Sequence, residues 1–107
     1  MKRKGTYVER KVANMLREKG WIVIRSTGSF GLADLVCIKD GKAMFIECKS
    51  TRSDRIYYKS YMGRKLEGFP FYVVADFGYG KIRILKPKKV IKPTDGQDFA
   101  EFLQKDL

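Results

Sequence analysis

Three residues near the middle of the chain, Asp34, Glu47 and Lys49, are of types that could together carry out hydrolysis. Two neighbouring carboxylates repel each other, and a divalent cation held between them removes the repulsion. Such a cation also polarises a phosphoryl oxygen and lowers the pKa of a bound water. An ammonium group beside it can orient or activate that water, or neutralise charge on the phosphate as the reaction proceeds. We therefore expect metal-dependent phosphodiester hydrolysis if the fold gathers these side chains.

A β-hairpin predicted in the middle of the chain would gather them. Residues 33–39 and 43–49 are apolar segments that we expect to form its two strands. The dipeptide Asp40-Gly41 between them is typical of a tight type I′ turn. With this dipeptide as the loop, Lys39 pairs with Lys42, and that pair sets the register of the whole hairpin.

This register places Asp34 directly opposite Glu47. Side chains at opposite positions of an antiparallel pair point to the same face, with Cβ atoms about 4.5–5.5 Å apart. Lys49 lies two residues beyond Glu47 on the same strand, so it shares that face. The alternative is an ordinary ion pair near a strand end, in which Lys49 bridges the two carboxylates. We favour the active site, because all three groups share one face beside strongly apolar strands.

Glu9 is a candidate fourth member of this site. The spacing of apolar residues predicts an amphipathic helix over residues 6–19 that Gly20 ends, and Glu9 lies at the border of its apolar stripe. From there the carboxylate could point toward the sheet. The alternative is a capping box, in which Thr6-Tyr7-Val8-Glu9 would turn Glu9 back to the helix start. Beside the hairpin cluster, coordination of a metal or of its water is the favoured interpretation.

A glycine- and serine-rich loop over residues 26–32 is predicted to follow a short strand over residues 21–25. Arg25 ends that strand, and Ser29 lies within the loop. Both could contact a phosphate next to the proposed site. The alternative, a simple strand connection, is equally compatible with the spacing.

The rest of the chain completes an α/β fold, with a central mixed β-sheet flanked by helices. A chain of 107 residues has the size of one ordinary domain, so we expect a single domain over residues 1–107. The further predicted elements are extended chain over residues 56–58, a short helix over 60–68, strands over 70–77 and 81–86, a basic connector over 87–93, and a terminal helix over 95–107.

The amino-acid composition excludes several types of catalytic and metal site. The chain has no histidine, which excludes a Ser-His-Asp triad and a histidine base, and its two cysteines lack the spacing of a structural zinc site. Any metal must therefore be bound by oxygen, which indicates Mg²⁺ or Mn²⁺. We find no signal peptide and no apolar segment long enough to span a membrane, so we expect a cytoplasmic protein without a membrane partner.

Basic residues give the chain a formal net charge of +11, for which nucleic acid is the usual partner. Such residues bind phosphates by charge and read little sequence. The alternative for each basic run is a solvated surface. The expected DNA contacts in these runs are Lys2, Arg3, Lys4, Arg52, Arg55, Lys59, Arg64 and Lys65.

The pattern of Asp34 followed by Glu47-Cys48-Lys49, after a helix carrying Glu9, resembles the PD-(D/E)xK nuclease superfamily and its restriction-endonuclease-like fold. Within that superfamily the chain resembles the archaeal-type Holliday-junction resolvases over residues 3–58. The matching stretches are Arg3-Lys4-Gly5, Glu9-Arg10, Gly20-Trp21, Val23-Ile24-Arg25-Ser26, Gly28-Ser29, Ala33-Asp34-Leu35-Val36 and Ile46-Glu47-Cys48-Lys49.

The resemblance implies a reaction and its partners. Members of this family act as homodimers whose two sites make paired, symmetric cuts across a four-way DNA junction, with Mg²⁺ as the cofactor and Mn²⁺ able to replace it. The residues that the resemblance assigns are Glu9, Asp34, Glu47 and the backbone carbonyl of Cys48 for the metal, Lys49 as the catalytic amine, and Arg10, Arg25 and Ser29 for cleavage.

One region departs from the family pattern, because the helix expected between Tyr58 and Pro70 is shorter than the family's. Aromatic residues there and elsewhere are candidates for an exposed patch that pairs two subunits, although core packing is the favoured interpretation for most of them. They are Tyr57, Tyr58, Tyr61, Phe69, Phe71 and Phe99. Three functions thus stay open: a junction-resolving nuclease, a repair or restriction-like nuclease of the same superfamily, and a non-catalytic DNA-binding module.

Overall fold

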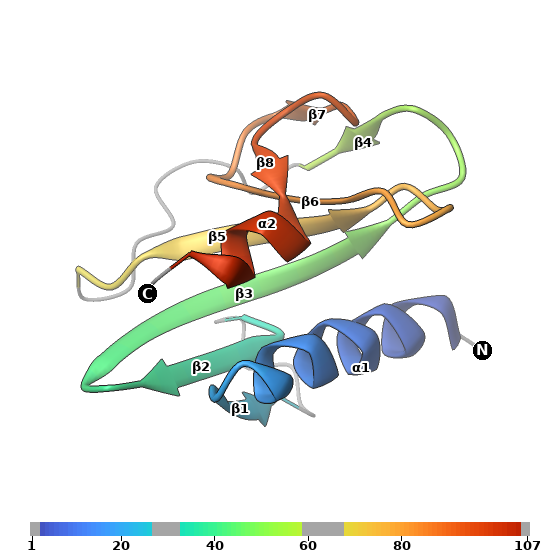
Figure 1. The fold of residues 1–107 in the computed structure, drawn as a ribbon. Helices are drawn as coiled ribbons and strands as arrows, with labels where there is room; N and C mark the ends of the chain where they lie inside the picture. Colours follow the sequence, from blue (N-terminus) through green and yellow to red (C-terminus); the bar gives the residue numbers. More distant parts are fainter. Residues whose placement is uncertain (1–2, 27–32, 59–67, 106–107) are drawn as a thin grey trace.

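The computed structural model describes residues 3–26, 33–58 and 68–105, with side chains described from Tyr7 onward (Figure 1). Most of the short helix predicted over residues 60–68, and the greater part of the loop predicted over 26–32, lie outside these ranges. None of the helices in the described ranges is long and apolar enough to cross a bilayer.

A six-stranded mixed sheet forms the centre of the fold, as predicted. Its strand order is β1-β2-β3-β5-β6-β8, and β3 pairs with β5 in parallel while every other pair in this sheet is antiparallel. The other two strands, β4 and β7, pair with each other in a small second sheet. The elements are α1 (Arg3–Glu18), β1 (Ile22–Arg25), β2 (Leu35–Lys39), β3 (Lys42–Ser50), β4 (Ile56–Tyr57), β5 (Phe71–Asp76), β6 (Ile82–Leu85), β7 (Val90–Ile91), β8 (Gln97–Asp98) and α2 (Phe99–Gln104).

The hairpin between β2 and β3 has the predicted register. Lys39 pairs with Lys42, and the ladder continues to the pair Leu35 and Ile46. Asp40 and Gly41 have φ angles of 49° and 78°, and two positive values are what a type I′ turn requires. The turn therefore aligns the two strands as expected from the dipeptide alone.

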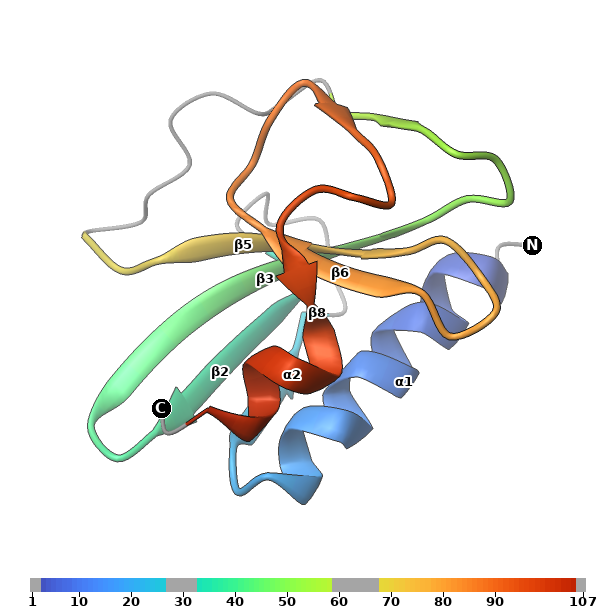
Figure 2. The ribbon, with the colours of Figure 1, turned by 45° about the horizontal axis from the view of Figure 1, so that its top comes forward.

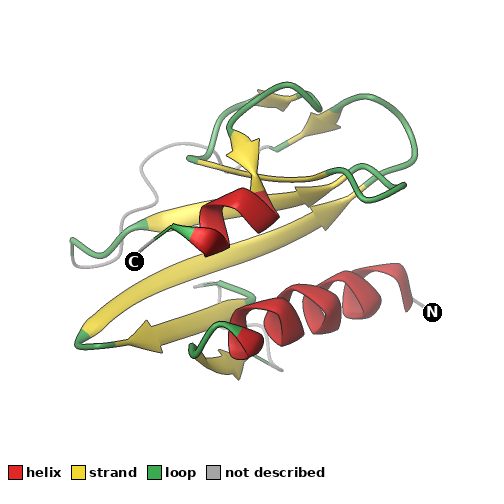
Figure 3. Ribbon diagram, viewed as in Figure 1, coloured by secondary structure: helices red, strands yellow, loops and turns green. Residues whose placement is uncertain are grey.

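Both helices pack against the same face of the large sheet. Figures 2 and 3 show this packing from two directions. Val8, Val12 and Leu16 of α1 are buried there, in one cluster with Phe99 and Phe102 of α2. Each such side chain removed from water contributes on the order of 1.5–3 kcal/mol before entropy costs. The opposite face carries a separate apolar cluster, which joins β5 and β6 to the small sheet.

The C-terminal part of the chain differs from the prediction. The terminal helix runs from Phe99 to Gln104. It begins at Phe99 because Asp98 is its N-cap and accepts from the Glu101 N–H at 3.1 Å. Asp95, which was expected to begin the helix, instead closes a turn by accepting from the Lys92 N–H at 2.7 Å. Gln97 and Asp98 form β8 against β6, and Val90 and Ile91 of the predicted basic connector form β7.

An ion pair with a buried acceptor fixes α1 to the sheet. Lys11 Nζ lies 3.0 Å from Oδ2 of Asp76, whose side chain is 8% exposed, at the end of β5. The other oxygen of Asp76 accepts from the Gly78 N–H at 2.8 Å. Since Lys11 follows Glu9 by two residues, this contact helps to place the helix that carries Glu9.

We predict that Asp76→Ala lowers the free energy of unfolding by about 2 kcal/mol, because it leaves Lys11 and the Gly78 N–H without their acceptor. Urea unfolding followed by circular dichroism measures this. Asp54→Ala is the matched control, because its side chain is 79% exposed beside Arg55. The control should change stability by less than about 0.5 kcal/mol. Equal effects of the two substitutions would contradict this role of Asp76.

Candidate active site

Asp34 is held in place by its backbone and its side chain together. It lies immediately before β2, where its N–H donates to the Ile46 carbonyl at 3.0 Å and its carbonyl accepts from the Ser26 N–H at 2.9 Å. Its carboxylate oxygen Oδ2 accepts from the backbone N–H of Cys48 at 2.8 Å. Because β2 has not begun at this point, the Asp34 carboxylate takes the place of a strand neighbour for β3. The hairpin register thus brings Asp34 to the segment that contains Glu47 and Lys49.

The surroundings of Asp34 disfavour its negative charge. Burial raises the pKa of its carboxyl group above the usual 3.8, although the hydrogen bond from Cys48 acts in the opposite direction. The carboxylates of Glu9 and Glu47 raise the pKa further, and the Lys49 ammonium lowers it. Glu9 and Glu47 are therefore both close enough to act on Asp34. A cation placed among them would offset both the burial and the repulsion.

Glu47 and Lys49 lie on the same face of β3, as their spacing predicts. Lys49 Nζ is 3.3 Å from Oε2 of Glu47. The ion pair considered as the alternative to an active site is therefore present for Glu47, while the Asp34 carboxylate accepts a hydrogen bond from the Cys48 backbone. Glu47 and Lys49 are opposite Val73 and Ala75 of β5, so they share the face that the small sheet covers.

Glu9 contacts the sheet and not the start of its own helix. Because α1 begins at Arg3, Thr6 lies inside the helix and the capping box is wrong. Arg25, at the end of β1, donates from Nη2 to Oε1 of Glu9 at 3.3 Å. The end of β1 and the side of α1 thus meet through two residues that were both predicted to serve the site.

Cys48 offers its backbone to the site. In an extended strand the N–H and the carbonyl of one residue point to the same neighbour. The Cys48 N–H points to Asp34, so its carbonyl faces the same edge. The thiol packs against the core, and burial raises its pKa well above the usual 9.0. Cys37 is fully buried and burial raises its pKa to about 12, so neither thiol is suited to chemistry at neutral pH.

The donor set fits a hard divalent cation. Three carboxylates and one carbonyl are the oxygen ligands that Mg²⁺ and Mn²⁺ prefer. Within the described ranges, no three acidic or cysteine side chains converge on one point. Glu9 and Glu47 instead pair with Arg25 and Lys49. The three carboxylates and the two cationic side chains leave one negative charge without a counter-charge. Because Glu9 and Glu47 are already in ion pairs, a bound cation would compete with Arg25 and Lys49 for them.

The other predicted contacts are only partly described. Arg10, Arg52 and Arg55 are exposed, as a phosphate contact requires, and Arg25 is half-buried. The backbone of Arg3 and Lys4 lies in the first turn of α1. The predicted residues outside the described ranges are Lys2, Ser29, Lys59, Arg64 and Lys65.

Tyr58 contacts the site, although the sequence did not assign it there. Its hydroxyl donates to Oε1 of Glu47 at 3.1 Å, and Lys49 Nζ lies 5.5 Å from the centre of its ring. The sequence offered one signal, the alternation of Ile56 and Tyr58 across an extended segment, which indicates that both point to the same side.

Core packing, the interpretation favoured for most of the six aromatic residues, is confirmed for three of them. Tyr58, Phe71 and Phe99 are buried and do not belong to an exposed patch. Tyr57 and Phe69 are exposed, and Tyr61 lies outside the described residues. Apolar side chains are exposed at another place, on β1 and β2, where Ile22 and Ile38 are paired and Ile24 lies next to them on the same face.

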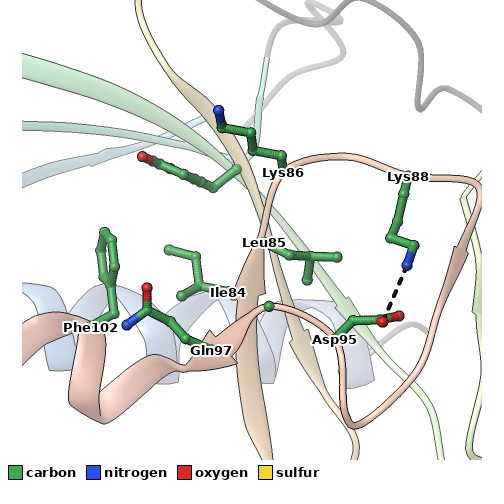
Figure 4. Close-up of a pocket in the computed structure, with 9 residues that line it drawn as sticks. Ile84, Leu85, Lys86, Lys88, Asp95, Gln97 and Phe102 are labelled. Carbon is green, nitrogen blue, oxygen red and sulfur yellow. Dashed lines mark ion pairs between the residues drawn. The ribbon is translucent and has the colours of Figure 1, made fainter.

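A pocket of about 540 Å³ lies away from these groups, between β6, β8 and α2 (Figure 4). Ile84, Gln97 and Phe102 line it, and Lys88 and Asp95 form an ion pair at its edge, 3.2 Å apart. Its lining includes none of the carboxylates predicted to bind metal. It therefore adds nothing to the hydrolytic site.

Comparison with known proteins gives a family match over most of the chain. Residues 1–94 match the family model described as archaeal Holliday junction resolvase (hjc). A crossover junction endodeoxyribonuclease Hjc from Methanocaldococcus jannaschii is 36% identical over 67 residues, which are 63% of this chain and 50% of that protein. The alignment thus spans half the length of this relative.

A solved structure shares the fold. The structure of Archaeoglobus fulgidus Hjc, a Holliday junction resolvase from an archaeal hyperthermophile, superimposes with a TM-score of 0.77 at 21% sequence identity. The superposition covers 97% of this chain and 98% of that one. At this identity the likeness concerns the architecture, namely the restriction-endonuclease-like arrangement predicted from the sequence.

Proposed function

Since the chain belongs to the archaeal Holliday junction resolvase family, we propose that it is a divalent-metal-dependent endodeoxyribonuclease that resolves four-way DNA junctions by paired, symmetric nicks. One observation carries the proposal. Asp34, Glu47 and Lys49 meet at one end of the β2–β3 hairpin, where Glu9 also acts on Asp34. We further propose that one domain, residues 1–107, carries the complete site.

The residues near the hairpin have different roles in the proposed reaction. Mg²⁺, or Mn²⁺ in its place, would be held by Glu9, Asp34, Glu47 and the Cys48 carbonyl, and would polarise a phosphoryl oxygen and acidify a water. Lys49 donates hydrogen bonds to the attacking water or to the phosphate, with its ammonium kept near the reaction by Glu47. Arg25, anchored to Glu9, orients the phosphate, and Ser29 assists it.

Exposed basic residues hold the DNA by its phosphates. Arg10, Arg52 and Arg55 are exposed, and the whole chain carries a formal net charge of +11. Contacts of this kind recognise the shape of the backbone and weaken steeply as the salt concentration rises. A non-catalytic DNA-binding module would gain nothing from three carboxylates directed at a phosphate backbone, which favours a nuclease.

We predict that Asp34→Asn and Lys49→Ala each lower the rate of junction cleavage by on the order of 10²–10³-fold or more, because Asp34 is proposed to bind the metal and Lys49 to act on the water or the phosphate. Both variants should still bind the junction, and Asp34→Asn should bind at least as tightly because a repulsive charge is gone. Cleavage of labelled four-way junction with Mg²⁺ or EDTA, and gel-shift binding, measure the two properties.

The matched controls lie at the other end of the same hairpin. Asp40→Asn and Lys42→Ala make the same changes at exposed positions, and asparagine accepts the positive φ at residue 40. They should cleave like the wild type. Loss of junction binding by Asp34→Asn would mean that Asp34 is misassigned. Equal cutting of linear duplex, flap, fork and junction would leave a nuclease of the same superfamily with another substrate.

We propose in addition that the chain acts as a homodimer, because paired cuts in two strands need two sites. An apolar strip on β1 and β2 supports this: Ile22 is 63% exposed and Ile24 is 52% exposed, and exposed apolar patches mark interfaces.

We predict a solution mass of about twice the 12.4 kDa of the chain, measured by light scattering after size exclusion. Ile22→Lys should shift the mass toward the monomer, because it places a charge within the apolar strip. Tyr79→Lys, at a fully exposed turn residue, is the control and should leave the mass unchanged. A monomeric wild type at the concentrations that support cleavage would overturn the dimer, and a dimeric Ile22→Lys would exclude this strip as the interface.

A further inference from the structure

Tyr58 is the one described aromatic residue that contacts both Glu47 and Lys49. It directly follows β4 and is only 3% exposed, in an apolar cluster with Ile56 and Ile91. Its backbone N–H donates to the Lys89 carbonyl at 2.9 Å, next to the pairing of β4 with β7. The small second sheet therefore fixes the position of this side chain against the face of β3.

Tyr58, Glu47 and Lys49 each contact the other two side chains. The Tyr58 hydroxyl donates to Oε1 of Glu47 at 3.1 Å, and Lys49 Nζ lies 3.3 Å from Oε2 of the same carboxylate. Lys49 Nζ also lies 5.5 Å from the centre of the Tyr58 ring, within the range of a cation–π contact. Each oxygen of Glu47 thus has its own partner, and Lys49 is attracted from two sides.

A purely structural residue at this position would not need the hydroxyl. The cluster around Tyr58 is apolar, with Val73, Ala75 and Leu85 among its members, and a phenylalanine would fill nearly the same volume. A hydroxyl in such surroundings costs free energy unless it is hydrogen-bonded, and here a carboxylate of the proposed site accepts the bond. The polar end of Tyr58 is therefore directed at the chemistry, while its ring belongs to the core.

We propose that Tyr58 is a positioning residue for the proposed reaction: its hydroxyl sets the orientation of the Glu47 carboxylate, and its ring restricts the Lys49 ammonium. The inference rests on the proposed function, because it assigns Glu47 to the metal and Lys49 to the phosphate. The hydroxyl occupies Oε1 and prevents Lys49 from drawing both oxygens of Glu47 to itself. The carboxylate keeps one orientation in which it can ligate a cation.

Two substitutions distinguish the role of the Tyr58 hydroxyl from the role of its ring. Tyr58→Phe removes the hydroxyl and keeps the ring, so it should weaken Mn²⁺ binding to the DNA-free protein by about 10–100-fold, as loss of a group that orients a metal ligand typically does. Tyr58→Leu also removes the ring, so it should lower the single-turnover cleavage rate at saturating metal below that of Tyr58→Phe. Junction affinity without metal should not change in either variant. Titration calorimetry with MnCl₂, single-turnover cleavage and gel shifts measure these quantities.

Tyr57→Phe is the matched control. It makes the same substitution one residue earlier, where the side chain is 67% exposed, and should leave metal affinity and rate unchanged. Thermal unfolding of each variant without metal tests the structural alternative. A Tyr58→Phe protein that loses only thermal stability, with wild-type Mn²⁺ affinity, would overturn the role of the hydroxyl. Equal rates for Tyr58→Phe and Tyr58→Leu would overturn the role of the ring.

The same experiment separates this inference from the proposed function. A wild type that binds Mn²⁺ but cuts none of the DNA substrates would contradict the nuclease. In that case the ratio of Mn²⁺ affinities of wild type and Tyr58→Phe would still decide whether Tyr58 orients Glu47.

Discussion

The pairing of β2 with β3 is the constraint on which the site depends. A type I′ turn at Asp40-Gly41 sets the register, and at the other end of the hairpin this register delivers the Asp34 carboxylate to the Cys48 N–H, 2.8 Å away. A slip of one residue would move every side chain of one strand to the other face and separate Asp34 from this hydrogen bond. The geometry of two loop residues thus controls a site at the far end of the strands.

Near this hydrogen bond, three carboxylates lie close together, and each has a partner that offsets its negative charge. Glu9 has Arg25, Glu47 has Lys49 and Tyr58, and Asp34 has a backbone N–H, so each carboxylate is held without a metal. Burial and the two neighbouring acids still raise the pKa of Asp34, which leaves a site that favours an added cation. In the proposed function, basic residues elsewhere would attract the DNA, and the acidic groups would bind the metal.

Local signals in the sequence predicted the parts of this site that local geometry determines. The turn dipeptide gave the hairpin register, and the period-two spacing placed Lys49 beside Glu47. Contacts between segments that are distant in the sequence could not be predicted from these local signals. The parallel pairing of β3 with β5 and the pairing of β4 with β7 join residues far apart in the chain, and Tyr58 reaches Glu47 only because of them. The predicted start of the terminal helix was wrong because two aspartates in this segment could each cap a helix, and the N-cap is Asp98 and not Asp95.

The proposed function requires that the acidic groups at this end of the hairpin share one divalent cation. Anomalous diffraction at the manganese edge, from crystals of the protein grown with Mn²⁺, locates such an ion directly. We expect a peak bonded by carboxylate oxygens of Asp34 and Glu47 and by the Cys48 carbonyl. Saturating Mn²⁺ that gives no peak there, or a peak only at other residues in a protein that still cuts DNA, would contradict the account.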